Sequence, residues 1–172
     1  MTLLNPLKIM MFGTPGSGKS TFACTLSTLT NIPVYHLDYY FYLPNWVERN
    51  YQEFLDIQRS IVKTNQWIID GNNTKSLDIR YKEADLVLYF NYPRITCYWR
   101  VFKRFIMKRK TTNDRAPGCP ENIRWCLLKY MWHFKKKAAS IIEKLQNDYP
   151  NTQFLEIRSD NDLKKVEKYF VK

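Results

Sequence analysis

The segment GTPGSGKS, residues 13–20, carries the spacing GxxxxGK[ST], whose fixed positions are Gly13, Gly18, Lys19 and Ser20. Glycines at this spacing let backbone N–H groups close round phosphate oxygens, because no side chain stands in the way. The lysine would neutralise the β- and γ-phosphates, and the serine hydroxyl would bind Mg²⁺. The motif therefore predicts a site for ATP and Mg²⁺. The predicted ATP-binding residues are Gly13, Pro15, Gly16, Ser17, Gly18, Lys19, Ser20 and Thr21.

Two aspartates follow short apolar runs that predict buried strands: Asp38 after VYHL and Asp70 after WII. Phosphoryl transfer needs a metal held by acidic or hydroxyl groups and an acceptor placed in line with the phosphate. Ligands of parallel sheets bind at the carboxyl ends of the strands, so both aspartates should lie beside the phosphate loop. We expect Asp70 to hold Mg²⁺ together with Ser20, and Asp38 to orient the acceptor hydroxyl or take its proton. Either aspartate could instead be an ordinary turn former or helix cap.

A long basic stretch without acidic residues runs between Asp85 and Asp114. On a helix, Arg100 and Arg104 fall on one side together with Lys103 and Lys108. The apolar residues on the other side are Ile95, Tyr98, Phe102, Phe105 and Ile106. Like charges along one side repel each other, and a bound anion would relieve that repulsion. We therefore predict phosphate contacts from this stripe, with Arg104 taking part in catalysis; a plain solvated face is the alternative.

The segment RKTTNDRAPGCPEN, residues 109–122, has no apolar periodicity of its own and joins two predicted helices. Long structureless connections inside compact domains are often functional. We interpret the segment as a short lid that closes over the phosphates to exclude water. Arg109 and Arg115 are the charges that would arrive with it, and Arg109 is a candidate catalytic residue. The alternative is an ordinary connector.

The chain that must position these residues alternates strand patterns with helical ones. Strands are predicted at 7–12, 33–38, 66–71, 84–93 and 153–158, and helices at 19–30, 51–64, 94–109, 121–147 and 161–171. Such alternation predicts an α/β protein with the three-layer α/β/α architecture of P-loop NTPases and a five-stranded parallel sheet. We expect one domain over residues 1–172, with an acceptor-side insertion at about 39–65 and the lid at about 109–122.

Charge and composition narrow the classes of partner. The formal net charge of +11 favours anionic partners such as nucleotides, phosphorylated metabolites and nucleic acid. The four cysteines form no CxxC pair, and His36 and His133 lie outside the usual ligand spacings, so no His/Cys metal site is expected. The apolar N-terminal stretch is too short to span a bilayer and lacks a cleavage site. We predict a cytoplasmic protein with no membrane partner.

Several segments resemble the DNA topology modulation protein (FlaR-like) family, within the wider adenylate-kinase-like P-loop NTPases. They are GTPGSGKST, IPVYHLDYYFYLPNWVE, QWIIDGNNTKSLDIRYKEADLVLYFNYPRITCYWRVFKR and GCPENI, and they cover most of residues 8–125. The resemblance implies a five-stranded parallel sheet, an ATP site at Gly13–Thr21 and a kinase-like arrangement with a lid. It also implies phosphate contacts by Arg80, Arg100 and Arg104. Arg80 and Arg100 are the candidates for binding the phosphate of the substrate. Adenylate kinases carry DGFPR where this chain has DGNNT, so the resemblance does not extend to AMP as the acceptor.

Two functions of different classes fit these features. The first is a phosphotransferase that moves the γ-phosphoryl group of ATP to a nucleotide or a similar small acceptor. The second is a nucleotide-regulated DNA-binding protein that affects DNA topology, which the net charge motivates, although no helix-turn-helix, zinc finger or RNA-binding signature accompanies it. A protein that binds ATP without transferring anything is a third. The sequence is compatible with a monomer or a dimer.

Overall fold

A computed structural model describes residues 6–107, 116–119 and 125–171. Its centre is a five-stranded sheet with the strand order β2-β5-β1-β6-β7. The strands are β1 (Lys8–Gly13), β2 (Val34–His36), β5 (Trp67–Asp70), β6 (Leu86–Phe90) and β7 (Gln153–Ile157). Every pairing within this sheet is parallel. The predicted α/β class with a five-stranded parallel sheet is therefore confirmed.

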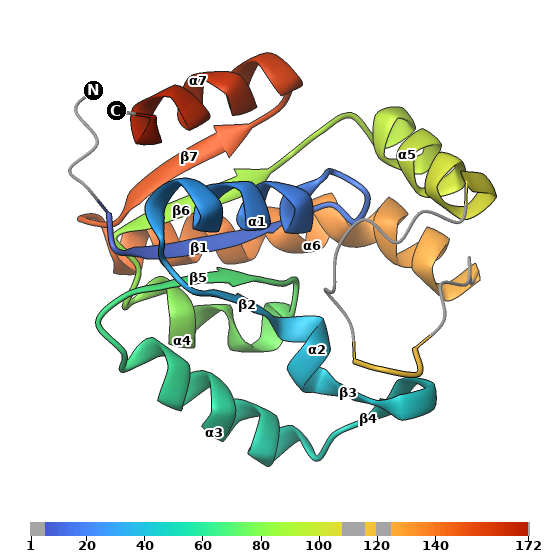
Figure 1. Ribbon diagram of the computed structural model, residues 1–172, viewed down its shortest axis with the longest axis horizontal. Coiled ribbons are helices and arrows are strands. Elements are labelled where there is room, and N and C mark those ends of the chain that lie inside the picture. The colour runs from blue at the N-terminus through green and yellow to red at the C-terminus, as the bar shows by residue number, and fades with distance from the viewer. Residues whose placement is uncertain (1–5, 108–115, 120–124, 172) are drawn as a thin grey trace.

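Helices cover both faces of the sheet (Figure 1). They are α1 (Lys19–Thr30), α2 (Leu37–Phe41), α3 (Tyr51–Val62), α4 (Leu77–Tyr81), α5 (Arg94–Met107), α6 (Trp125–Asp148) and α7 (Asp160–Phe170). The apolar faces of α1 and α7 pack on one side of the sheet, and those of α3, α4 and most of α6 pack on the other. The sheet is thus the middle layer of three.

The central strand β1 shows why the chain folds into layers. Successive side chains of a strand point to opposite faces, so Ile9 and Met11 enter one apolar cluster while Met10 and Phe12 enter the other. All four side chains are fully buried. A strand covered on both faces reads as a continuous apolar run, which is the pattern that the sequence shows here and in β6.

The structure differs from the prediction where elements are short. Strand β2 ends at His36 rather than residue 38, because the next residues form the helix α2. Asp38 therefore lies in the first turn of a helix and not at the end of a strand. The hairpin of β3 (Tyr42–Leu43) and β4 (Val47–Glu48) and the helix α4 were also missed. Elements of two to five residues are too short to show a periodicity.

The predicted insertion at 39–65 contains most of α2, the β3–β4 hairpin and α3. Of the predicted lid, only residues 116–119 belong to the described chain, and they contact that hairpin. The backbone N–H of Asn45 donates to the carbonyl oxygen of Gly118 at 3.2 Å, and the Cys119 thiol donates to the carbonyl oxygen of Leu43 at 3.3 Å. Arg109 and Arg115 lie outside the described residues, so the lid stays a prediction. No helix in the described part of the chain is long and apolar enough to cross a bilayer.

Candidate functional site

The glycine-rich loop joins β1 to α1 at the carboxyl edge of the sheet, as the motif predicts (Figure 1). Gly16 and Gly18 have φ angles of 80° and 95°, in the left-handed region that favours glycine. A Cβ atom on Gly16 would also stand 2.6 Å from the carbonyl oxygen of Cys97. The loop passes so close to α5 that only glycine fits at this position. The motif therefore specifies a backbone shape as well as a set of donors.

The N-terminus of α1 is open to an anion. Its capping residue, Gly18, offers no side-chain acceptor, and the first turn contains no acidic residue. The first N–H groups of a helix need acceptors, and the helix dipole favours a negative charge there. Two buried hydroxyl oxygens of the loop, Thr14 Oγ1 and Ser17 Oγ, likewise have no hydrogen-bond partner among the described residues. Buried polar groups are normally hydrogen-bonded, so these groups fit a phosphate ligand.

Lys19 is the first residue of α1, and its side chain points into the site. The residue is only 8% exposed, and its Nζ donates to the carbonyl oxygen of Thr14 at 3.3 Å. Burial lowers the pKa of this lysine, while the negative charges of Asp70 and Asp38 partly oppose that shift. A buried cation is costly unless anions accompany it, and the two carboxylates offset the effect of burial only in part. A phosphate arriving at the loop would supply a further anion.

Asp70, the last residue of β5, is buried beside β2. In the sheet register it pairs with His36, whose Nδ1 lies 3.1 Å from Asp70 Oδ2. Burial alone would raise the pKa of Asp70. The hydrogen bond from His36, the charge of Lys19 and a hydrogen bond from Ser20 together bring that pKa below its ordinary value. The carboxylate is therefore held in its charged form within the site.

His36 was missed by the sequence analysis, which considered it only as a metal ligand by spacing. Besides its contact with Asp70, its Nε2 lies 3.6 Å from the sulfur of Cys24 on α1. The signal for this pairing is the strand order, because β2 and β5 are neighbours although 34 residues separate the two side chains. A single sequence shows strands but not which strand lies next to which.

The donor set of Ser20 and Asp70 fits a magnesium ion. Asp70 Oδ1 is buried without a hydrogen-bond partner among the described residues, while Oδ2 is occupied by His36. Ser20 lies close enough to the same carboxylate to lower its pKa. Mg²⁺ prefers oxygen ligands and keeps several waters, so one carboxylate and one hydroxyl are a suitable protein contribution.

Asp38 is exposed in the first turn of α2, on the same edge of the sheet. Its charge raises the pKa of Lys19, and it adds to the effect of burial in raising the pKa of Tyr130 on α6. The structure thus brings Asp38, Asp70 and Lys19 together, as the sequence analysis expected, although Asp38 reaches the site from a helix.

A second missed residue, Asn72, connects the phosphate loop to the turn after β5. Its side-chain oxygen Oδ1 accepts a hydrogen bond from the backbone N–H of Gly13 at 2.9 Å. The hydroxyl of Tyr130 donates to the carbonyl oxygen of the same asparagine at 3.4 Å. The segment DGNN therefore fixes the start of the loop. Its composition indicates a turn, but the contact joins residues 59 positions apart.

Arg80 on α4 is fully buried. Its Nη1 donates to Gln58 Oε1 at 2.6 Å, and its Nη2 donates to the carbonyl oxygen of Asn73 at 3.4 Å. Burial lowers the pKa of this guanidinium to about 10. In this structure the arginine contacts the protein and holds the turn beside Asn72; its role as a substrate ligand stays a prediction.

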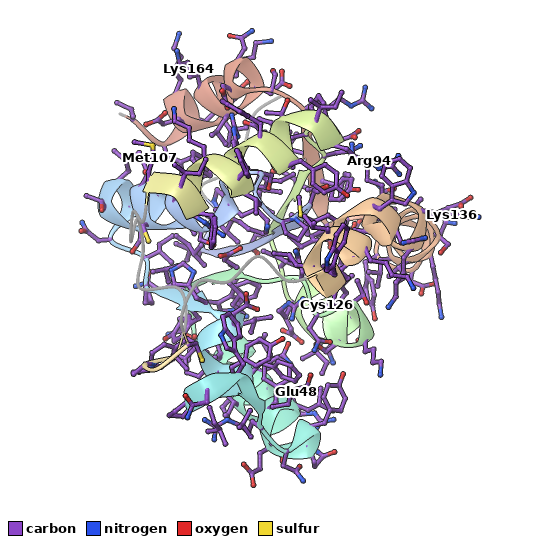
Figure 2. The ribbon with its side chains drawn as sticks, turned by 90° about the vertical axis from the view of Figure 1, so that its right-hand side faces the viewer. Glu48, Arg94, Met107, Cys126, Lys136 and Lys164 are labelled. Atoms are coloured by element: carbon purple, nitrogen blue, oxygen red, sulfur yellow. The ribbon has the colours of Figure 1, made fainter. Side chains whose placement is uncertain are left out.

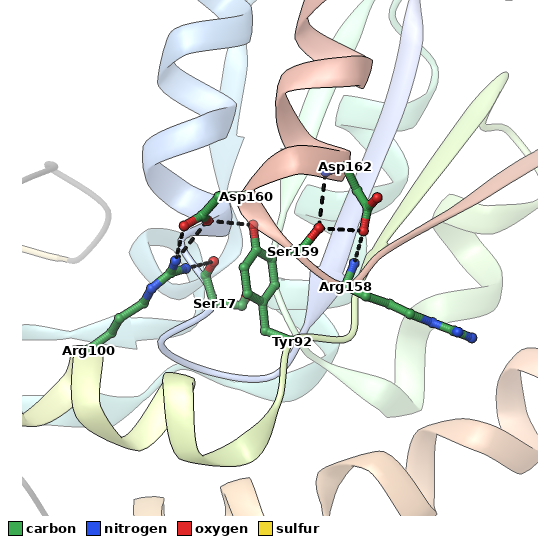
Figure 3. A network of polar contacts seen from close by, with 7 residues as sticks. All are labelled: Ser17, Tyr92, Arg100, Arg158, Ser159, Asp160 and Asp162. Carbon is green, nitrogen blue, oxygen red and sulfur yellow. Dashed lines mark hydrogen bonds and ion pairs between the residues drawn. The ribbon is translucent and has the colours of Figure 1, made fainter.

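Arg100 on α5 binds two parts of the molecule at once (Figure 3). Its Nη1 donates to the carbonyl oxygen of Ser17 at 3.0 Å, and its Nη2 contacts both carboxylate oxygens of Asp160 at 2.7 and 2.8 Å. The guanidinium also lies 4.7 Å from the ring centroid of Tyr92, whose hydroxyl donates to Asp160 at 2.9 Å. This arginine joins the phosphate loop to the start of α7. A direct contact with substrate stays a prediction.

The two sides of α5 that the sequence distinguishes have different surroundings in the fold. The buried residues of this helix are Cys97 and Val101, and the charge of Arg104 is close enough to Lys19 to lower its pKa. The exposed large apolar residues of α5 are Ile95, Trp99, Phe102, Phe105, Ile106 and Met107. Arg100 and Arg104 thus lie toward the phosphate loop, while most of the predicted apolar side, apart from Tyr98, is exposed. Amphipathicity showed two faces but could not show which one the fold would cover.

Comparisons with known proteins confirm the fold. Neither the sequence profiles of known families nor the sequences of curated proteins give a match. Among solved structures, the chain is similar to deoxyadenosine kinase from M. mycoides, with a TM-score of 0.55, 17% identity and coverage of 93% of this chain and 94% of that one. A gluconokinase from Sinorhizobium meliloti 1021 gives a TM-score of 0.50 at 12% identity, covering 96% and 90%. A sugar kinase from Janibacter sp. gives 0.50 at 14% identity, covering 94% and 92%. The chain has the fold of P-loop kinases.

Proposed function

We propose that this protein is a phosphotransferase that moves the γ-phosphoryl group of ATP to a small acceptor. The observation that carries the proposal is the position of Lys19. It is a buried cation at an uncapped helix N-terminus, beside two carboxylates that differ in exposure, Asp70 buried and Asp38 exposed. A loop that only bound phosphate would not need Asp38, whereas a phosphotransferase needs an exposed group that can take the proton of the acceptor.

On the donor side, the loop amides, the hydroxyls of Thr14 and Ser17 and the ammonium of Lys19 would hold the phosphates. Ser20 and Asp70 would hold Mg²⁺, which when bound neutralises charge on the phosphate oxygens. In the transfer, the acceptor oxygen forms a bond to the γ-phosphorus while the bond to the bridging oxygen breaks and ADP leaves. The exposed carboxylate of Asp38 would take the proton of the acceptor hydroxyl.

On the acceptor side, the segment around Asp38 is rich in aromatic rings. They are Tyr35, Tyr39, Tyr40, Phe41, Tyr42, Trp46, Tyr51 and Phe54, and neighbouring members lie with ring centroids 4.8–6.4 Å apart. Tyr39 and Tyr51 are exposed, whereas Phe54 belongs to the buried core. Aromatic side chains bind flat, partly apolar rings well. This favours a nucleoside or nucleotide as the acceptor over a sugar acid. The similarity to a deoxyadenosine kinase whose structure holds dCMP and dCDP supports this assignment.

The first test is binding of Mg·ATP by isothermal titration calorimetry to the wild type and to Lys19→Ala. A matched control is Lys82→Ala, which removes an exposed lysine at the end of α4. We expect Lys19→Ala to bind Mg·ATP with at least tenfold lower affinity and the control variant to bind it with the affinity of the wild type. Equal binding by all three proteins, or none by the wild type, would contradict the proposal.

The second test is a coupled assay of ADP release with nucleosides, nucleoside monophosphates, sugars and sugar acids as acceptors. We expect slow ATP hydrolysis alone and faster turnover with one acceptor class. Asp38→Asn should lower kcat with the right acceptor while leaving ATP binding intact. If no acceptor accelerates turnover and Lys19→Ala has the same residual ATPase activity as the wild type, the enzyme proposal fails.

The alternative function, nucleotide-regulated DNA binding, is favoured by the net charge of +11 and by the resemblance to topology modulation proteins. DNA affinity that arises from the positive net charge must fall steeply with salt, because lysine and arginine side chains displace counterions from the DNA phosphates. Fluorescence anisotropy with a labelled duplex at low and physiological salt tests it. Weak binding that does not respond to salt removes this alternative.

A further inference from the structure

The outer face of α5 carries four large apolar side chains in a row, here called the α5 stripe: Ile95, Trp99, Phe102 and Ile106. They are 84%, 62%, 49% and 62% exposed. In Figure 2, α5 lies toward the viewer and runs between the labelled Arg94 and Met107. Single exposed apolar residues are ordinary, but contiguous apolar patches mark interaction sites. The α5 stripe lies on the side of the helix that faces away from the phosphate loop.

The spacing of the α5 stripe is that of a helix–helix seam. Its members follow one another at intervals of four, three and four residues, which is the repeat of the core positions in a two-stranded coiled coil. Such a row forms a straight line along one helix and packs against an equivalent row on another. We propose that a second copy of this chain packs on the α5 stripe, so that two α5 helices pair across a two-fold axis.

The area agrees with a dimer contact. If a side chain of this size exposes about 200 Å² when fully accessible, the four residues expose roughly 500 Å². Phe105 on α5 and Trp132 on α6, which lies beside Arg94 at the start of α5, are also exposed and add roughly 200 Å². The sum is close to the ~800 Å² that each partner buries in a stable interface. A two-fold contact uses the same patch on both copies, so the apolar face finds a complementary surface without another protein.

The charges argue against an anionic surface as the occupant. The arginines of α5 have partners within the molecule: Arg100 binds Ser17 and Asp160, and the guanidinium of Arg94 lies 5.0 Å from the Trp132 ring. Among the described residues of α5, only Lys103 presents a cation on the exposed side. A helix that lies on anionic lipid carries several outward lysines or arginines beside its apolar side. The stripe is therefore better suited to an apolar partner.

The net charge of the chain predicts how the stability of the dimer depends on salt. Each copy carries +11, so two copies repel each other at low ionic strength, and salt screens that repulsion. Dimer formation should strengthen as salt is raised. Binding to DNA or to anionic vesicles would weaken under the same change. The direction of the salt effect thus separates the proposed partner from both anionic alternatives.

Sedimentation equilibrium on the full chain over a range of protein concentrations, at low and at physiological salt, tests the proposal. We expect a monomer–dimer equilibrium whose dissociation constant falls at least threefold when salt is added. A chain that remains monomeric at all concentrations in both salts overturns the proposal. So does a dimer that weakens as salt is raised.

A charge swap locates the contact. Trp99→Glu with Phe102→Glu in one chain and Trp99→Lys with Phe102→Lys in another should each abolish the homodimer, while an equal mixture should form a heterodimer. Circular dichroism confirms that each variant folds, and the single variant Ile106→Ser, expected to weaken the dimer at least tenfold, gives a milder test. Tyr169→Glu, at an exposed apolar position of α7, is the matched control and should dimerise like the wild type. A dimer that survives both double variants overturns the proposal.

Discussion

Removing the side chain of His36 should destabilise the protein by about 2–3 kcal/mol at neutral pH. Asp70 is buried with its charge, and the hydrogen bond from His36 is the largest of the influences that lower its pKa against the effect of burial. A hydrogen bond to a charged group contributes ~1.5–3 kcal/mol net, and a buried charge that loses its partner costs ~3–5 kcal/mol. Lys19 and Ser20 remain beside the carboxylate, which keeps the expected loss within the first range and no higher than the bottom of the second.

Two conservative substitutions separate the role of the donor atom from that of the ring. The amide nitrogen of His36→Asn can stand close to Nδ1, which contacts Asp70, whereas that of His36→Gln stands close to Nε2, which contacts Cys24. We expect the asparagine variant to keep at least half of the stability that alanine loses, and the glutamine variant to resemble alanine. Cys24→Ala, which removes the contact on the other nitrogen, should cost less than about 1 kcal/mol.

Guanidinium denaturation followed by tryptophan fluorescence and circular dichroism, with linear extrapolation to water, measures these differences. A magnesium titration of ATP binding adds a functional readout, in which His36→Ala should need at least tenfold more Mg²⁺ and His36→Asn less than threefold more. If His36→Asn and His36→Gln lose equal stability, or if His36→Ala loses less than about 1 kcal/mol, the hydrogen bond from His36 Nδ1 does not stabilise the charged form of Asp70.

Three further outcomes are expected. Gly13→Ala should lose ~3 kcal/mol or more of unfolding free energy, because its Cβ would stand 2.3 Å from a backbone carbonyl oxygen. Gly18→Ala should lose only about 1 kcal/mol, because its Cβ would meet the Arg100 side chain at an ordinary van der Waals distance of 3.7 Å and only the positive φ is strained; denaturant titration of both variants decides this. Arg80→Met should cost about 2 kcal/mol by the same assay, because Gln58 Oε1 and the carbonyl oxygen of Asn73 each lose one donor, and a neutral effect would show that water replaces the guanidinium. The hydrogen bond from Arg100 lowers the pKa of Asp160 against burial, so its stability contribution is present above the ordinary carboxyl pKa and is lost as pH falls through the depressed value. Asp160→Asn should therefore flatten the acid limb of a stability–pH curve by no more than about 1 kcal/mol, and an unchanged limb would contradict the assignment.

The chemistry of the phosphate loop could be predicted from the sequence because it depends on local geometry. The residues from Gly13 to Ser20 are contiguous, and the apolar patterns on either side predict the strand and the helix that flank them. The central strands β1 and β6 are fully buried, so their apolar runs were also readable. The predicted bounds of α1 are those that the structure has.

The tertiary structure decided everything that depends on which elements are neighbours. His36 meets Asp70 because β2 lies next to β5, and Asn72 meets Gly13 because β5 lies next to β1. These pairs are separated by 34 and 59 residues, and no local pattern encodes the strand order. Arg80 likewise became a buried arginine only once Gln58 was brought against it by the packing of α3 on α4.

The direction of α5 is the clearest case of this division. Its sequence determined two faces, one basic and one apolar, with a helical period. Arg100 turns toward the phosphate loop, where it donates to the carbonyl oxygen of Ser17 and to the carboxylate of Asp160. The helical repeat of apolar and basic residues shows that α5 has two different sides. The neighbouring elements decide which of these sides is buried.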